Sequence, residues 1–94
     1  MKKPTHEEEM IFDFIMDFLA GDPDYHLLND EEKEQTYGIY KTILSAVYRS
    51  NFDDNVYPII YVKDQMSKRL IQESISKLAY LVPSVTRVTV AVVH

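Results

Sequence analysis

Residues 56–93 read VYPIIYVKDQMSKRLIQESISKLAYLVPSVTRVTVAVV, and this stretch decides the fold. Its two ends, 56–62 and 85–93, are rich in β-branched and aromatic residues, which is typical of strands. Between them, over 65–81, apolar residues recur at the spacing of a helix that Asp64 can cap. A strand, a helix and a second strand in this order could form a right-handed βαβ unit with parallel strands, although the sequence alone does not give the strand direction.

The first half of the chain predicts two further helices. Two residue pairs have the spacing of a capping box: Thr5 with Glu8, and Asn29 with Glu32. We expect one helix over residues 6–20 and a second that runs from Asn29 to about Arg49. Between them, Asp22-Pro23-Asp24 predicts a turn, and 25–28 a short connector. The apolar stripe of the first helix consists of Ile11, Phe14, Ile15 and Phe18, widened by Met10, Phe12 and Leu19.

These elements predict a single small domain over residues 1–94, of the α/β (or α+β) class. Its order is α-α-β-α-β, with a small sheet packed by helices. Pro58 lacks a donor for the ladder, which places it at the start or edge of its strand. Two strands alone make a marginal sheet, and the nearly uncharged last strand offers an open edge. We therefore expect the sheet to be extended or covered in a homodimer.

The composition argues against several classes of protein. Without cysteine, the chain has no disulfide, thiolate metal site or cysteine nucleophile. Its two glycines cannot form a phosphate-binding loop, and no G-x-S-x-G motif is present. No apolar run approaches the roughly 20 residues of a membrane span, and no signal peptide is recognisable. We expect a cytoplasmic, non-enzymatic protein that holds no cofactor or metal and contacts no membrane.

The negative charge is concentrated in the first third of the chain. Eleven acidic residues and three lysines give residues 1–34 a net charge of −8, whereas residues 35–94 carry +3 and the whole chain −5. Acidic residues in the first turn of a helix are favoured by the helix dipole. Six residues have this explanation: Glu7, Glu8, Glu9, Asp30, Glu31 and Glu32.

The dipole does not explain Asp13 and Asp17. With Glu9 they form consecutive like-charge pairs at four-residue spacing, each costing about 0.2–0.5 kcal/mol, on a helix without lysine or arginine. Asp22 and Asp24 prolong this acidic track. We therefore predict that the track binds a basic protein surface. The predicted partner-binding residues are Glu8, Glu9, Asp13, Asp17, Asp22, Asp24 and Glu31.

A sharper hypothesis is mimicry of DNA. Carboxylates four residues apart on a helix are separated by roughly 6 Å, and duplex DNA carries a phosphate about every 3.4 Å of axis per strand. By functional analogy, small acidic phage proteins inhibit restriction and other DNA-binding enzymes in this way, within the host cytoplasm. The analogy rests on size, charge and missing catalytic motifs, because no family-specific motif is present.

Other readings have less support. The main alternative is a small structural or assembly protein that forms a homo-oligomer through its C-terminal strand. A metal site at His6, Glu9, Asp13 and Asp17 is disfavoured because helical neighbours alone rarely enclose an ion. A calcium loop starting at Asp22 is rejected, since its sixth and twelfth positions hold Leu27 and Lys33. Direct nucleic-acid binding is not expected from so acidic a chain, despite four basic residues in its second half: Lys63, Lys68, Arg69 and Lys77.

Overall fold

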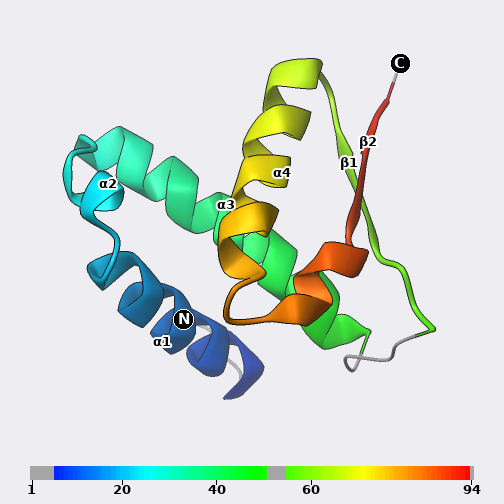
Figure 1. Ribbon diagram of the computed structural model, residues 1–94, viewed down its shortest axis with the longest axis horizontal. Coiled ribbons are helices and arrows are strands. Elements are labelled where there is room, and N and C mark those ends of the chain that lie inside the picture. The colour runs from blue at the N-terminus through cyan, green and yellow to red at the C-terminus, as the bar shows by residue number, and fades with distance from the viewer. Residues whose placement is uncertain (1–5, 51–54, 94) are drawn as a thin grey trace, which may run out of the picture. The chain divides into compact units, whose positions relative to one another are not determined.

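The computed structural model describes residues 6–50 and 55–93, and their elements follow the predicted α-α-β-α-β order with two short additions. The elements are α1 (His6–Ala20), α2 (Pro23–His26), α3 (Asp30–Arg49), β1 (Ile59–Val62), α4 (Gln65–Leu78), the 3₁₀ helix η1 (Pro83–Arg87) and β2 (Thr89–Val92) (Figure 1). The chain divides within α3 into two compact units, Met1–Lys41 and Thr42–His94. The prediction of one domain over residues 1–94 stays a prediction.

In the first unit, α1 has the predicted bounds. Its buried side chains, Ile11, Ile15 and Leu19, recur every four residues and form one stripe. Phe14 and Phe18, also assigned to the stripe, are half-buried. The prediction that Met10 and Phe12 widen it is wrong, because both are about half exposed. Thr5, the predicted cap, lies outside the described residues.

The segment between α1 and α3 differs from the predicted turn and connector, because residues 23–26 form the one-turn helix α2. Asp22 caps this helix by accepting a hydrogen bond from the Asp24 N–H (3.0 Å). Pro23 occupies the first helical turn, where its missing N–H costs nothing. The motif Asp22-Pro23-Asp24, which predicted a turn, therefore lies at the start of a helix. This helix is too short to show a periodic sequence pattern.

The capping box predicted at the start of α3 is confirmed. The Glu32 N–H donates to Asn29 Oδ1 (2.8 Å), and the Asn29 N–H donates to Glu32 Oε1 (3.1 Å). Two N–H groups that the helix cannot pair are thereby satisfied. The box fixes where α3 begins, and so positions the following residues that face α1.

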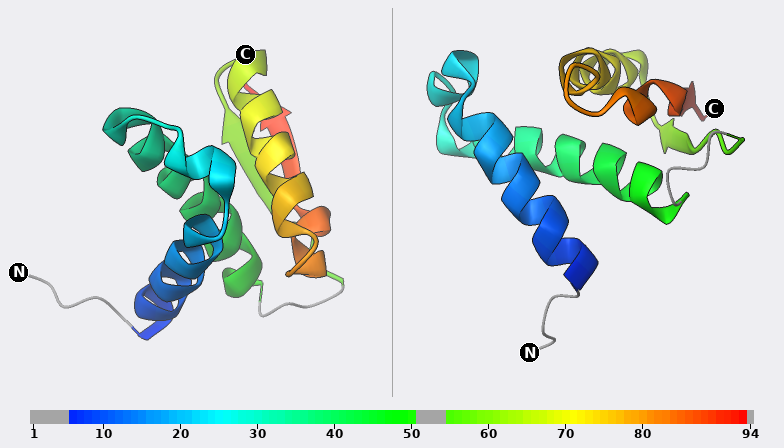
Figure 2. Two further views of the ribbon diagram at one scale, coloured as in Figure 1. Left: turned by 60° about the vertical axis from the view of Figure 1, so that its left-hand side comes forward. Right: turned by 60° about the horizontal axis from the view of Figure 1, so that its bottom comes forward.

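In the second unit, the two strands are parallel and α4 connects them, which is the βαβ arrangement that the element order allowed and makes the fold α/β. Ile59 pairs with Thr89 and Val62 with Val92, and α4 packs along both strands (Figure 2). Asp64 caps α4 by accepting a hydrogen bond from the Ser67 N–H (2.7 Å). The buried side chains of this unit are Ile43, Leu44, Val47, Ile71, Leu78, Val85, Val88 and Val90.

Both strands are shorter than predicted. β1 starts after Pro58, whose carbonyl accepts a hydrogen bond from the Thr89 N–H (2.8 Å), so this proline stands at a strand start as expected. The predicted last strand, 85–93, is wrong over 85–88, because Pro83 initiates η1. Val85 is buried within η1, so its β-branched side chain reflects packing and not strand structure.

None of the helices in the described part of the chain combines the length and apolar character that crossing a membrane requires.

Candidate functional site: the outer face of α1

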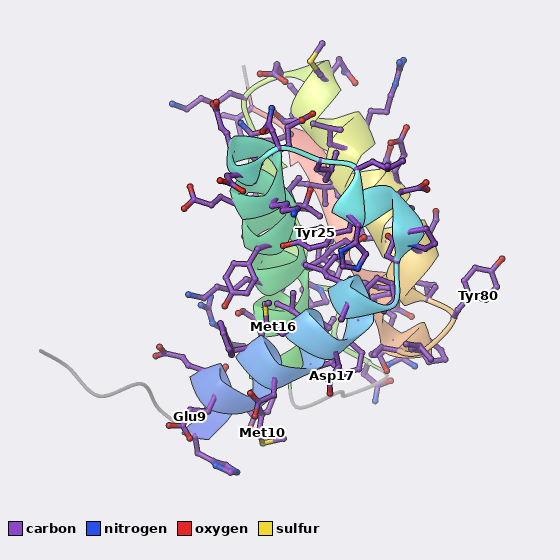
Figure 3. The ribbon with its side chains drawn as sticks, turned by 90° about the vertical axis from the view of Figure 1, so that its left-hand side faces the viewer. Glu9, Met10, Met16, Asp17, Tyr25 and Tyr80 are labelled. Carbon is purple, nitrogen blue, oxygen red and sulfur yellow. The ribbon has the colours of Figure 1, made fainter. Side chains whose placement is uncertain are left out.

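The predicted row Glu9, Asp13 and Asp17 lies on α1 opposite its buried stripe. At about 100° per residue, the row centres roughly half a turn away from the stripe formed by Ile11, Ile15 and Leu19. All three row carboxylates are exposed, and Figure 3 labels the first and last of them. The rise of about 1.5 Å per residue separates successive row residues by about 6 Å. We call this surface the outer face of α1.

Within the described residues, one lysine lies beside two of the three row carboxylates. Among the residues that the structure describes, no ion pair involves Asp13 or Asp17. Lys41 of α3 lines the same shallow hollow as Glu8, Glu9 and Asp13. The sequence pattern missed this lysine because it comes from another helix. Asp17 is not among the residues that line this hollow.

The remaining predicted residues do not continue the row. Asp22 is half-buried and its carboxylate caps α2, which gives it a structural role. Asp24 and Glu31 are exposed in the first turns of α2 and α3, where the helix dipole favours them. The predicted residues on α1 are thus Glu8, Glu9, Asp13 and Asp17, and partner binding by Asp22, Asp24 and Glu31 stays a prediction.

Apolar side chains beside the row belong to the same surface, although the sequence pattern assigned Met10 and Phe12 to the buried stripe. Met10, Phe12 and Met16 are 48%, 49% and 40% exposed, respectively. On the helical wheel, Met10 flanks the row on one side and Phe12 and Met16 flank it on the other. The outer face thus combines charge with polarizable apolar groups.

Two shallow hollows lie between α1 and the first half of α3. One, of about 490 Å³, is lined by Glu8, Glu9, Phe12, Asp13, Tyr37 and Lys41. The other, of about 450 Å³, is lined by Phe12, Met16, Tyr25, Lys33, Glu34 and Tyr37. Phe12 and Tyr37 contribute to both, and their rings meet edge to face with centroids 5.8 Å apart. The two hollows therefore adjoin at this aromatic pair, and together we call them the groove.

Metal binding has no geometric support within the part of the chain that the structure describes. No group of three or more histidine, aspartate or glutamate side chains there could hold an ion. His6 and the row carboxylates thus do not converge on a common point.

No protein-family model matches the chain, and no match was found among curated proteins or solved structures.

Proposed function

We propose that the protein is a non-enzymatic inhibitor or adaptor that binds a basic protein surface through the outer face of α1. The observation that carries the proposal is the exposed row Glu9, Asp13 and Asp17 opposite the buried stripe. Such a row costs helix stability through like-charge repulsion, and a basic partner would relieve that cost. Stability alone would favour alternating signs at these positions.

The sharper form of the proposal is DNA mimicry. The partner is then a DNA-binding or restriction enzyme, and the protein acts in the cytoplasm, that of the host if it comes from a phage. The spacing of about 6 Å between row carboxylates supports this form, because it is on the scale of phosphate spacing in DNA. The flanking Met10, Phe12 and Met16 would add apolar contact area that a DNA backbone lacks.

The test is the variant Asp13→Asn/Asp17→Asn, which removes two negative charges. We expect it to lose the basic partner while α1 becomes more stable, because two like-charge pairs of about 0.2–0.5 kcal/mol each disappear. Binding is measured by capture on the immobilised protein from cell lysate, with competing duplex DNA. Thermal unfolding reports the stability.

The matched control is Glu73→Lys, which changes the net charge equally at an exposed position on α4. It should leave capture intact. A captured DNA-binding protein that DNA displaces supports mimicry. Equal capture by the double variant and the original protein would exclude the outer face of α1 as the binding surface.

A second candidate function is assembly of a homo-oligomer through the sheet. Within the described residues, β1 and β2 pair only with each other. Ile59 and Tyr61 of β1 remain 51% and 67% exposed, although parallel sheets are usually covered on both faces. A second copy that adds a strand, or covers this face, would satisfy both features. In the lysate experiment, capture of copies of this chain alone supports this candidate.

A further inference from the structure

The groove between α1 and the first half of α3 has two chemically different ends. Glu8, Glu9 and Asp13 line one end against the single cation Lys41, which leaves that end with a net charge of −2. The opposite charges of Lys33 and Glu34 balance at the other end, where aromatic and thioether groups supply most of the surface. Its apolar side chains are Phe12, Met16, Tyr25 and Tyr37, and Figure 3 labels Met16 and Tyr25. A complementary ligand therefore needs a positive end and an apolar end.

One aromatic ring of the groove already lies beside a cation of the same chain. The Lys33 Nζ lies 5.5 Å from the centroid of the Tyr25 ring, within the range of about 6 Å for a cation–π interaction. The Phe12–Tyr37 pair lies at the centre of the groove, next to the acidic end, and Phe12 is 49% exposed. A cationic side chain laid on this pair would reach Glu9 and Asp13, which line the same hollow.

We infer that the groove receives an arginine-bearing amphipathic segment of the partner protein. The guanidinium lies on the Phe12–Tyr37 pair and binds the carboxylates of Glu9 and Asp13, while an apolar neighbour packs against Met16 and Tyr25. This inference rests on the proposed function, since it specifies which part of a basic partner binds beside the outer face of α1.

Arginine fits this site better than lysine because its planar guanidinium stacks on rings and pairs with carboxylates through two hydrogen bonds. Methionine side chains accept apolar anchors of varied shape, as in other grooves that bind amphipathic helices. A purely electrostatic contact would leave the apolar end of the groove unused. Charge complementarity at one end and apolar complementarity at the other therefore select a protein segment as the occupant.

The probe is a synthetic amphipathic peptide with arginines on one face and leucines on the other. Matched peptides replace arginine by lysine or by uncharged citrulline, or leucine by serine. Fluorescence anisotropy gives the affinities for the full chain, and ¹H–¹⁵N spectra locate the bound peptide. We expect shifts to concentrate on residues 8–16 and 33–41. The arginine–leucine peptide should bind most tightly.

The decisive variants are Phe12→Ala and Tyr37→Ala. Each should weaken peptide binding by about tenfold, a loss within the range of a cation–π contact. The matched control is Tyr80→Ala, because Tyr80 is 91% exposed after α4 and should not contribute (Figure 3). Circular dichroism checks that each variant folds. If Tyr37→Ala does not fold, Tyr37→Leu keeps the bulk of the side chain, removes the ring and gives the same answer.

Failure of the groove and failure of the proposed function give different results. If Asp13→Asn/Asp17→Asn abolishes peptide binding while both aromatic variants bind normally, the peptide does not bind in the groove. The outer face of α1 then remains the binding surface. No detectable binding, or equal binding of the arginine and lysine peptides, overturns the inference, and capture from lysate still tests the proposed function independently. A tenfold loss in both aromatic variants, with Tyr80→Ala unchanged, establishes the groove.

Discussion

Asn29 determines where α3 begins, because its side chain and that of Glu32 satisfy each other's backbone N–H groups. We predict that Asn29→Ala lowers the free energy of unfolding by about 1 kcal/mol, the usual cost of a lost N-cap. Urea unfolding followed by circular dichroism measures this loss. Asn29→Asp keeps an acceptor at the same place and should be near neutral. Equal losses in the two variants would contradict a role for the cap.

The stabilisation of α4 by its Asp64 cap depends on pH. The Ser67 N–H, which donates to its carboxylate, lowers the pKa of Asp64 below the ordinary value of 3.8. Because the pKa is lower in the folded protein than in the unfolded chain, the charged cap stabilises the fold fully above about pH 4. This stabilisation is lost as the pH falls through the folded-state pKa.

We therefore predict that the stability difference between the original protein and Asp64→Asn shrinks as the pH falls below 3.8. Urea unfolding of both proteins, at neutral pH and in acid, measures the difference. The contributions of the other carboxylates to the pH dependence cancel in this difference, because those groups are present in both proteins. A difference that stays constant with pH would show that the charge of Asp64 does not support the helix.

At the scale of elements, alternate residues of β2 point their N–H groups toward the edge of the strand that does not pair with β1. The N–H groups of Thr89 and Val93 donate to β1, at Pro58 and Val62. Because neighbouring residues of a strand point in opposite directions, the N–H groups of Val90 and Val92 point to the other edge. A second chain that extended the sheet at β2 would bind there.

We predict that Val92→Pro prevents assembly through β2 while preserving the β1–β2 ladder, since it removes a donor from the open edge only. Light scattering at high protein concentration would show a monomer for this variant and an oligomer for the original protein. Val92→Thr keeps both the shape and the N–H, and should assemble normally. If the original protein is itself monomeric, or Val92→Pro still assembles, the strand-edge interface is wrong.

The elements that could be predicted from sequence are those fixed by neighbours along the chain. Caps at Asn29 and Asp64 act over three residues, so their motifs gave the starts of α3 and α4 directly. The start of the last strand was harder to predict, because β-branched residues suit a buried 3₁₀ turn as well as a strand. Pro83 decided between the two structures.

The candidate site was only partly predictable for a related reason. The spacing of Glu9, Asp13 and Asp17 places them on one face of a helix, and that prediction did not depend on the rest of the fold. Which apolar residues remain exposed beside them depends on how far packing covers α1. The exposure of Phe12, and the meeting of Phe12 with Tyr37, therefore required the tertiary structure.

For the whole molecule, the charge asymmetry follows the division into units. Residues 1–41 carry eleven acidic and four basic residues, a net charge of −7, whereas residues 42–94 carry four acidic and six basic residues, a net charge of +2. An approaching basic protein is thus attracted mainly to the first unit, and salt should weaken this attraction.

The division between the units falls inside α3, after Lys41, and this position has a practical consequence. A chain cut there would expose roughly four carbonyl groups at one new helix end and roughly four N–H groups at the other, all without helical partners. Truncation would thus remove helix from both fragments. Loss of binding by a fragment would then report fraying of α3 and not the absence of a binding residue. Point substitutions in the intact chain avoid this ambiguity.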